Sequence, residues 1–410
     1  MGHWHPEFDD DGDGDDGGAG SGPTRARGSA GTRRLLFLAL APFLVATVFG
    51  LVMFWPGGDR GASRLDLGFD TDLIDGTVRS AEIAACAATA PETDIECRLY
   101  QVRLSEGPDA GDTIPLELQD SPTTVRLDPG DRIVLARATQ PDIPADLRYT
   151  FADFQRERPL ALLALLFVAA VVALGRWRGA RALVGLGLSL LVLTRFVLPS
   201  ILEGNNAIAV SLTGSSVIML AALYLSHGFN DRSTTAVLGT LASLGLTGVL
   251  AAMFVGLTHL TGLADEDARI LQVATEQVSL SGLLLGGIII GTLGVLDDVT
   301  VTQVSAVWQL HQANPTMGVR RLYQSALAIG RDHIASTVNT LVLAYAGASL
   351  PLLVLFVEVQ RGLGDVLTGE TVATEVVRTL IGSIGLVASV PLTTLLAALV
   401  ISGRSPAPPE

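Results

Sequence analysis

The stretch that decides the fold of this chain is residues 283–303, LLLGGIIIGTLGVLDDVTVTQ, in which an apolar run leads into two neighbouring aspartates. A helix of about 20 residues crosses the hydrocarbon core of a bilayer, and we expect a span here from Ser281 to about Thr302. Seven other runs are similarly apolar and carry few charges, at residues 35–55, 159–174, 183–202, 207–225, 234–257, 336–357 and 377–401. The pattern predicts an α-helical multi-pass membrane protein with eight transmembrane helices.

Composition supports a membrane protein and excludes some other classes. Of the 410 residues, 49% are hydrophobic and only 17% are charged, whereas an average soluble domain has about 25% charged residues. The formal net charge of −14 argues against a nucleic-acid partner, because phosphate binding needs clustered cations. The bilayer itself is the first partner that we expect.

The polar segments divide the chain into regions. Residues 1–34 are acidic and glycine-rich before a group of arginines, which is typical of a disordered cytoplasmic tail. The first apolar run, 35–55, ends in Phe54-Trp55-Pro56 without a small-residue cleavage site, so we expect it to remain as a signal anchor. Residues 56–158 form an extracytoplasmic domain, 159–402 a seven-helix membrane domain, and 403–410 a cytoplasmic tail.

The arginines indicate the orientation. They precede the first span and then recur on alternate connections, near residues 176–181, 232, 320–331 and 404. Loops rich in arginine stay on the cytoplasmic side of a membrane. Both termini are therefore expected in the cytoplasm.

The extracytoplasmic insert reads as a small β-domain. Five segments alternate apolar and polar residues between turn signals, at 76–83, 95–104, 113–118, 123–127 and 131–138. Five short strands of this kind favour an OB-like barrel. Cys86 and Cys97 both lie in this domain, on the oxidising side, and we expect them to form a disulfide.

Charged residues inside a membrane span are rare and usually functional, which draws attention to Asp297 and Asp298. Neighbouring residues on a helix point about 100° apart, so the two carboxylates lie on different faces. Asp298 aligns with a stripe of glycines that ends in Thr302, whereas Asp297 aligns with bulky apolar residues and Gln303 follows both. Because glycine stripes mark close packing in membranes, we expect Asp298 to face the bundle interior. The alternative is that both aspartates only end the span at the interface.

A second polar stretch, residues 330–339, leads into the seventh span. Asp332, Ser336 and Asn339 align on one face and His333 begins another, with Arg331 beside them. We expect these side chains to share a polar or ion site with Asp298 and Thr302, with Asp297, Gln303 and Arg331 in secondary roles. Read more simply, Arg331 marks the cytoplasmic side and Asp332 caps a helix, which leaves His333 and Asn339 unexplained.

Four separated motifs carry a resemblance to a known family. They are GTLGVLDDVTVTQ (291–303), GRDHIASTVN (330–339), LAYAG (343–347) with Pro351, and HGFN (227–230). They resemble the YibE/F family of bacterial membrane proteins over about residues 75–402, and the arginine-only, Ala- and Gly-rich composition resembles that of actinobacterial members. The resemblance implies a multi-pass permease-type protein of the bacterial inner (plasma) membrane and assigns no catalytic or binding residue.

Three functions compete at this point. The first is a secondary permease for a small solute or ion, with the polar site in the sixth and seventh spans. The second is a membrane scaffold or sensor whose β-domain binds an envelope partner, in a homo-oligomer or alone. The third, an intramembrane aspartyl protease, is disfavoured because Leu296, not glycine, precedes Asp297 and no second midspan aspartate is present. The sequence also lacks nucleotide-binding, serine-hydrolase and zinc-protease motifs, so we expect no enzyme activity, cofactor or metal.

Overall fold

The computed structural model describes residues 30–57, 71–86, 96–140, 148–264, 266–274, 278–358 and 362–403. Five strands form one sheet: β1 Thr71–Ala85, β2 Glu96–Leu104, β3 Thr113–Gln119, β4 Arg132–Ala138 and β5 Tyr149–Phe154. The longer helical elements are α1 Ala30–Met53, α2 Glu157–Val192, α4 Ala207–His227, α5 Asp231–Leu257, α7 Leu280–Ala313, α8 Val319–Ala348 and α11 Glu370–Ser402. Shorter elements are the π-helix η1 Leu193–Val197, α3 Leu198–Leu202, α6 Glu266–Ala274, α9 Leu350–Glu358 and α10 Leu363–Thr368.

The insert between α1 and α2 is a curled antiparallel sheet with strand order β3-β2-β1-β4-β5. Its long central strand β1 pairs with β2 through its second half and with β4 through its first half, which curls the sheet around the buried Tyr100, Ile133 and Leu135. The described strands form a half-barrel, and the OB-like barrel itself stays a prediction. Cys86 and Cys97, at the end of β1 and the start of β2, are joined by a disulfide with their Cα atoms 5.0 Å apart.

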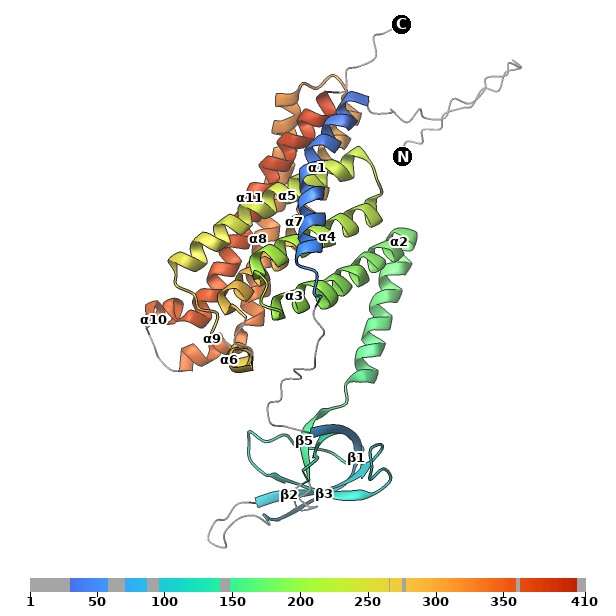
Figure 1. Ribbon diagram of the computed structural model, residues 1–410, viewed down its shortest axis with the longest axis vertical. Helices are drawn as coiled ribbons and strands as arrows, with labels where there is room; N and C mark the ends of the chain where they lie inside the picture. The colour runs from blue at the N-terminus through green and yellow to red at the C-terminus, as the bar shows by residue number, and fades with distance from the viewer. Residues whose placement is uncertain are drawn as a thin grey trace, which may run out of the picture.

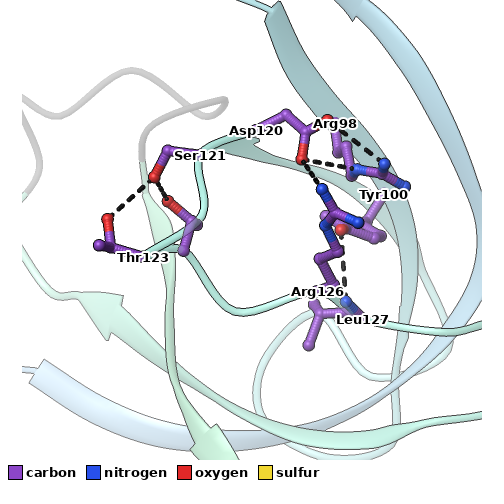
Figure 2. A network of polar contacts seen from close by, with 8 residues as sticks. Arg98, Tyr100, Asp120, Ser121, Thr123, Arg126 and Leu127 are labelled. Carbon is purple, nitrogen blue, oxygen red and sulfur yellow. Dashed lines mark hydrogen bonds and ion pairs between the residues drawn. The ribbon is translucent and has the colours of Figure 1, made fainter.

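One expected strand is absent and another was missed. The segment 123–127 is a loop, because Ser121 Oγ hydrogen-bonds the hydroxyls of Thr123 and Thr124 and turns the chain out of the sheet (Figure 2). The loop is fixed at its far end by Leu127, whose backbone N–H donates to the Tyr100 hydroxyl. The fifth strand is β5, which pairs with β4 immediately before α2 begins.

Asp120 holds this loop to the sheet. Its Oδ1 lies 3.1 Å from Arg98 Nε and 3.3 Å from Arg126 Nη2, and Arg98 Nη2 donates to its Oδ2 (Figure 2). The hydrogen bond from Arg98 and the positive charges of both arginines hold the pKa of the Asp120 carboxyl below its usual value. Elsewhere in the sheet, burial raises the pKa of Tyr149, and the hydrogen bond that its hydroxyl donates to Asp109 adds to the rise.

Six described helical segments are long and apolar enough to cross a membrane: Arg33–Met53, Glu157–Leu202, Ala207–His227, Asp231–Leu257, Leu280–Ala313 and Glu370–Ser402. The second of these turns sharply at Arg176, where φ is 49° and ψ is −134°, so its two arms correspond to the expected spans 159–174 and 183–202 (Figure 1). Gly179 permits the turn, because a Cβ there would collide with the Val171 carbonyl of the opposite arm. The expected span 336–357 is divided between α8 and α9 at Ser349. The count of eight therefore stays a prediction.

The helical bundle is organised around α5, α7 and α11, whose small residues allow close approach. Gly239 of α5 packs on Thr393 of α11, and Gly385 of α11 packs in return on Thr247 of α5. In α7, the Thr300 hydroxyl lies 2.7 Å from that of Thr240 in α5. Figure 1 shows the start of α1 and the end of α11 at one end of the bundle, with the β-sheet beyond the other end.

The expected tail boundaries lie mostly outside the described residues. Residues 1–29 and 404–410 are not described, and the first helix begins at Ala30, before the predicted boundary at residue 35.

Candidate functional site

Helix α7 gives the two central aspartates different surroundings. The Asp297 side chain is half-buried, and its Oδ1 atom is buried with no hydrogen-bond partner among the described residues. The Asp298 side chain is exposed. Its backbone carbonyl accepts a hydrogen bond from the Thr302 hydroxyl, 2.9 Å away, and Thr302 is exposed as well.

The expectation that Asp298 faces the bundle interior is wrong for the described chain. The glycine stripe that carries it is open: a Cβ at Gly287 or Gly294 would meet nothing within 4 Å, and at Gly291 only the Tyr345 hydroxyl at 3.6 Å. The opposite face packs instead, because its bulky side chains, among them Leu293 and Val304, belong to the main hydrophobic core. Burial of large apolar side chains stabilises the bundle more than contact along glycines, and this decides which face of α7 turns inward.

Gln303 is a packing residue of the bundle. It is buried, and its Nε2 donates to the Ala326 carbonyl of α8 at 2.8 Å and to the Thr394 hydroxyl of α11 at 2.7 Å. Gly330 of α8 makes this approach possible, since a Cβ there would lie 2.9 Å from Gln303 Oε1. A buried amide that joins three helices is a structural link, and its hydrogen-bonding capacity is largely used.

The predicted polar residues of α8 lie at the surface. Arg331, Asp332, His333, Ser336 and Asn339 are all exposed. Within the described part of the chain, no hydrogen bond or ion pair joins any of them to Asp298.

The two helices nevertheless place both polar stretches at similar depth. They run antiparallel, with Gly291 of α7 beside Tyr345 and Gln303 beside Gly330. Counting along the helices from these contacts puts Asp298 level with about residues 336–337 of α8. The structure brings the stretches to one level without joining their side chains.

A cavity that the sequence analysis did not foresee lies where α1 begins. It has a volume of about 1240 Å³ and is lined by residues from α1, α2, α4, α5 and α7. Four arginines line it, namely Arg33, Arg178, Arg181 and Arg232, together with His227 and Asp231. The arginines were interpreted only as markers of the cytoplasmic side, and no linear spacing reveals that arginines from three separate helices converge.

The cavity and Asp297 share one face of α7. Val301, Val304 and Trp308 line the cavity, and at helical spacing they align with Asp297. Asp297 precedes Val301 by four residues, or about 6 Å along the helix axis. The half-buried carboxylate is therefore one helical turn deeper in the bundle than the cavity wall.

Comparisons with known proteins give one result. No curated protein and no solved structure matches this chain. The family described as YibE/F-like protein matches residues 163–403, which is more than half of the chain and covers the helices from the first arm of α2 to the end of α11. The chain therefore belongs to the YibE/F-like protein family.

Proposed function

We propose that this YibE/F-like protein is a secondary permease for a small solute or ion, resident in a bacterial plasma membrane with both termini in the cytoplasm. The observation that carries the proposal is the Asp297 carboxylate, whose buried oxygen has no described partner and which lies one turn beyond the arginine-lined cavity. Ionisable groups within a membrane span are costly to place there, and in transporters they bind the substrate or the coupling ion.

The rest of the bundle suits such a role. Its central helices meet through glycine, serine and threonine, as the Gly239–Thr393 and Gly385–Thr247 contacts illustrate. Small-residue interfaces allow packed helices to shift past one another, which alternating access requires. Since the sequence lacks a nucleotide-binding loop, the driving force would be an ion or solute gradient.

The α7–α8 surface is the second part of the proposed site. Asp298 and Thr302 on α7, and Asp332, His333, Ser336 and Asn339 on α8, are polar and exposed at similar depth. Groups of this kind at membrane depth face water or another protein surface. We place the solute pathway between Asp297 and this surface.

The test is transport by the full chain in proteoliposomes. Concentration jumps of sodium, protons, phosphate and sulfate are applied to protein-containing vesicles on a solid-supported membrane, and the transient current is recorded. We expect a current from the wild type for at least one of these ions. Asp297→Asn should abolish the current, whereas Asp365→Asn, an exposed acid in α10, should retain it.

The scaffold alternative predicts that the protein carries no transport current. If the wild type gives no more current than empty vesicles for all four ions, or if Asp297→Asn leaves the current unchanged, the permease proposal fails. A scaffold would then be favoured, with the disulfide-linked sheet as the surface for its envelope partner.

A further inference from the structure

The arginine-lined cavity has a concentration of positive charge that is unusual for this chain. The protein as a whole is acidic, with 41 acidic and 27 basic residues. Yet the described lining of one cavity includes four arginines and a single acid, Asp231. These arginines come from α1, the second arm of α2, and α5, so the fold assembles the charge from three separate segments.

The orientation of a membrane protein explains why arginines occur at this end but not why they converge. Arg320 and Arg321, at the start of α8, follow the same sequence pattern and are exposed, and they are not among the lining residues. The charge of the cavity therefore needs an explanation beyond the positive-inside rule.

At this cavity, two buried polar atoms have no hydrogen-bond partner among the described residues. Ser233 is 3% exposed and lines the cavity, and its hydroxyl makes no hydrogen bond within the described part of the chain. Arg181 also lines the cavity, and its Nε atom is buried and makes no hydrogen bond within the described residues. Buried polar groups are almost always paired, so unpaired donors on two helices that line one cavity indicate a ligand that accepts hydrogen bonds.

Helix α5 adds to the positive potential. Its first residues, from the N-cap Asn230 to Ser233, line the cavity, and the N-terminal end of a helix carries partial positive charge. The Asn230 side chain already accepts the backbone N–H groups of Arg232 and Ser233, so the Ser233 hydroxyl and Arg181 Nε are the donors that we assign to a ligand. The Arg232 guanidinium lies 6.0 Å from the centre of the Trp308 ring, and this contact positions its charge at the wall.

We propose that this cavity binds a phosphate-bearing anion. Arginine forks match the oxygens of phosphate in bidentate pairs, and the doubly charged phosphate group suits several arginines better than a single carboxylate does. The phosphate comes from a soluble compound or from the headgroup of an anionic lipid, because the chemistry of the site is the same for both. Binding does not require transport, so this proposal stands or falls separately from the permease.

Binding is tested on the full-length protein in neutral detergent. Inorganic phosphate is titrated at constant ionic strength, and the shift in unfolding temperature is followed by tryptophan fluorescence. We expect saturable stabilisation of the wild type. The double variant Arg178→Gln/Arg181→Gln should weaken phosphate binding at least about tenfold, as the loss of charge-assisted hydrogen bonds requires. The matched control Arg320→Gln/Arg321→Gln removes the same charge from the same end and should bind like the wild type.

Ser233→Ala keeps the test valid if the double variant does not fold. Removing an unpaired buried hydroxyl should leave the ligand-free unfolding temperature unchanged or raise it, because no protein hydrogen bond is lost. The same variant should reduce the phosphate-induced shift. A residue with only a packing role would lower the first value and leave the second alone.

Nanodiscs distinguish the two sources of phosphate. Protein is transferred into phosphatidylcholine discs with or without phosphatidylglycerol, and retained lipid is counted by native mass spectrometry. A lipid site predicts retained phosphatidylglycerol that is lost in Arg178→Gln/Arg181→Gln but not in the α8 control, with little effect of free phosphate. A soluble-ligand site predicts no selective retention of phosphatidylglycerol. It predicts instead that free phosphate stabilises the wild type and the α8 control but not Arg178→Gln/Arg181→Gln. If neither probe distinguishes the cavity variants from the control, the arginines serve orientation alone and the proposal is wrong.

Discussion

Neighbouring carboxylates in α7 have opposite surroundings because one residue step rotates the side chain by about 100° around the helix. Asp297 falls on the face whose large side chains pack against α4 and α5, and Asp298 on the face formed by glycines. Helical spacing in the sequence is enough to separate the two faces. It could not decide which face turns inward, because the choice depends on which helices pack on α7 from elsewhere in the chain.

The first prediction compares these two residues. Asp297→Asn should abolish the biological activity of the protein, whereas Asp298→Asn should be tolerated better, because only Asp297 carries a buried, unpaired oxygen. Asn keeps the shape and removes the charge, and the loss of a half-buried charge should leave the unfolding temperature unchanged or raise it. Complementation at matched protein levels, together with the unfolding temperature, checks both parts. A more damaging effect of Asp298→Asn would place the functional carboxylate on the glycine face.

Asp120 gives a pH-dependent prediction outside the membrane. Its pKa is lowered in the folded sheet by Arg98 and Arg126, so the folded state binds a proton less readily than the unfolded state. The resulting stabilisation is fully present above the usual carboxyl pKa of about 4 and is lost as the pH falls through the lowered value. Because these side chains are partly solvated, the effect should be small.

This effect is measured through the hydrogen-exchange protection factors of β2 and β3 in the full-length protein. The pH is varied from about 3 to about 6, a range that brackets the usual carboxyl pKa of about 4. Protection should fall at the acidic end in the wild type. Asp120→Asn should lower protection at pH near 6 and flatten the decline, since an amide does not titrate. An equally steep decline in the variant would assign the pH dependence to other carboxylates.

At the scale of single elements, helix α5 shows how small residues set the packing. Gly239 and Thr247 are two turns apart, and their partners on α11, Thr393 and Gly385, are two turns apart in the opposite direction. Each glycine accommodates a threonine of the other helix, so the antiparallel crossing is held at two points. The sequence shows the similar motifs GTLASLGLT (239–247) and GLVASVPLT (385–393), but similarity between spans rich in these residues does not by itself reveal a contact.

Two glycines of α5 provide a matched pair of substitutions. A Cβ at Gly239 would lie 2.5 Å from Thr393 Oγ1, whereas a Cβ at Gly245 would meet nothing within 4 Å. Gly239→Val should therefore lower the free energy of unfolding by about 1 to 3 kcal/mol through overpacking. Gly245→Val, on the exposed face of the same helix, should have little effect. Thermal unfolding in detergent compares the two, and equal losses would show that helix propensity, not the α5–α11 contact, controls the result.

The strands show where local pattern fails. Residues 123–127 alternate like a strand, but they follow Pro122, and the Ser121 hydroxyl hydrogen-bonds those of Thr123 and Thr124. Residues 149–154 were overlooked because they directly precede an apolar span, although Tyr149 and Phe151 alternate in the expected way. Strand pairing across the sheet decides both cases, and a single segment does not contain that information.

At the scale of the whole molecule, the apolar runs predicted most of the long helices because length and hydrophobicity are local properties. The turn at Arg176 separates two expected spans as the pattern required. The region 336–357 differs from the single span that was predicted. Its first part belongs to α8, which is polar on one face, and the helix then breaks at Ser349 before α9 begins. The cavity could not be predicted at all, since it exists only where residues of five helices meet.

The last prediction concerns the side of the membrane on which each connection lies. Single cysteines are introduced at exposed positions, and the native Cys86 and Cys97 do not interfere because they are joined to each other. The connection after α3 and the short helix α10 lie toward the β-sheet end of the bundle (Figure 1). The connections after α4 and α7 lie toward the end where α1 begins. Because arginines mark the latter end, we expect it to be cytoplasmic.

A membrane-impermeant maleimide applied to intact cells reads the orientation directly. Glu203→Cys and Asp365→Cys should react without permeabilisation, whereas Phe229→Cys and Pro315→Cys should react only after it. Glu203 precedes α4 and Phe229 follows it, so this pair alone tests whether α4 crosses the membrane. Pro315 and Asp365 lie on either side of α8 and α9, and opposite labelling of these two positions would establish that the divided segment crosses as well. Labelling of both from one side would remove that crossing and force α11 to end on the side opposite to the start of α1.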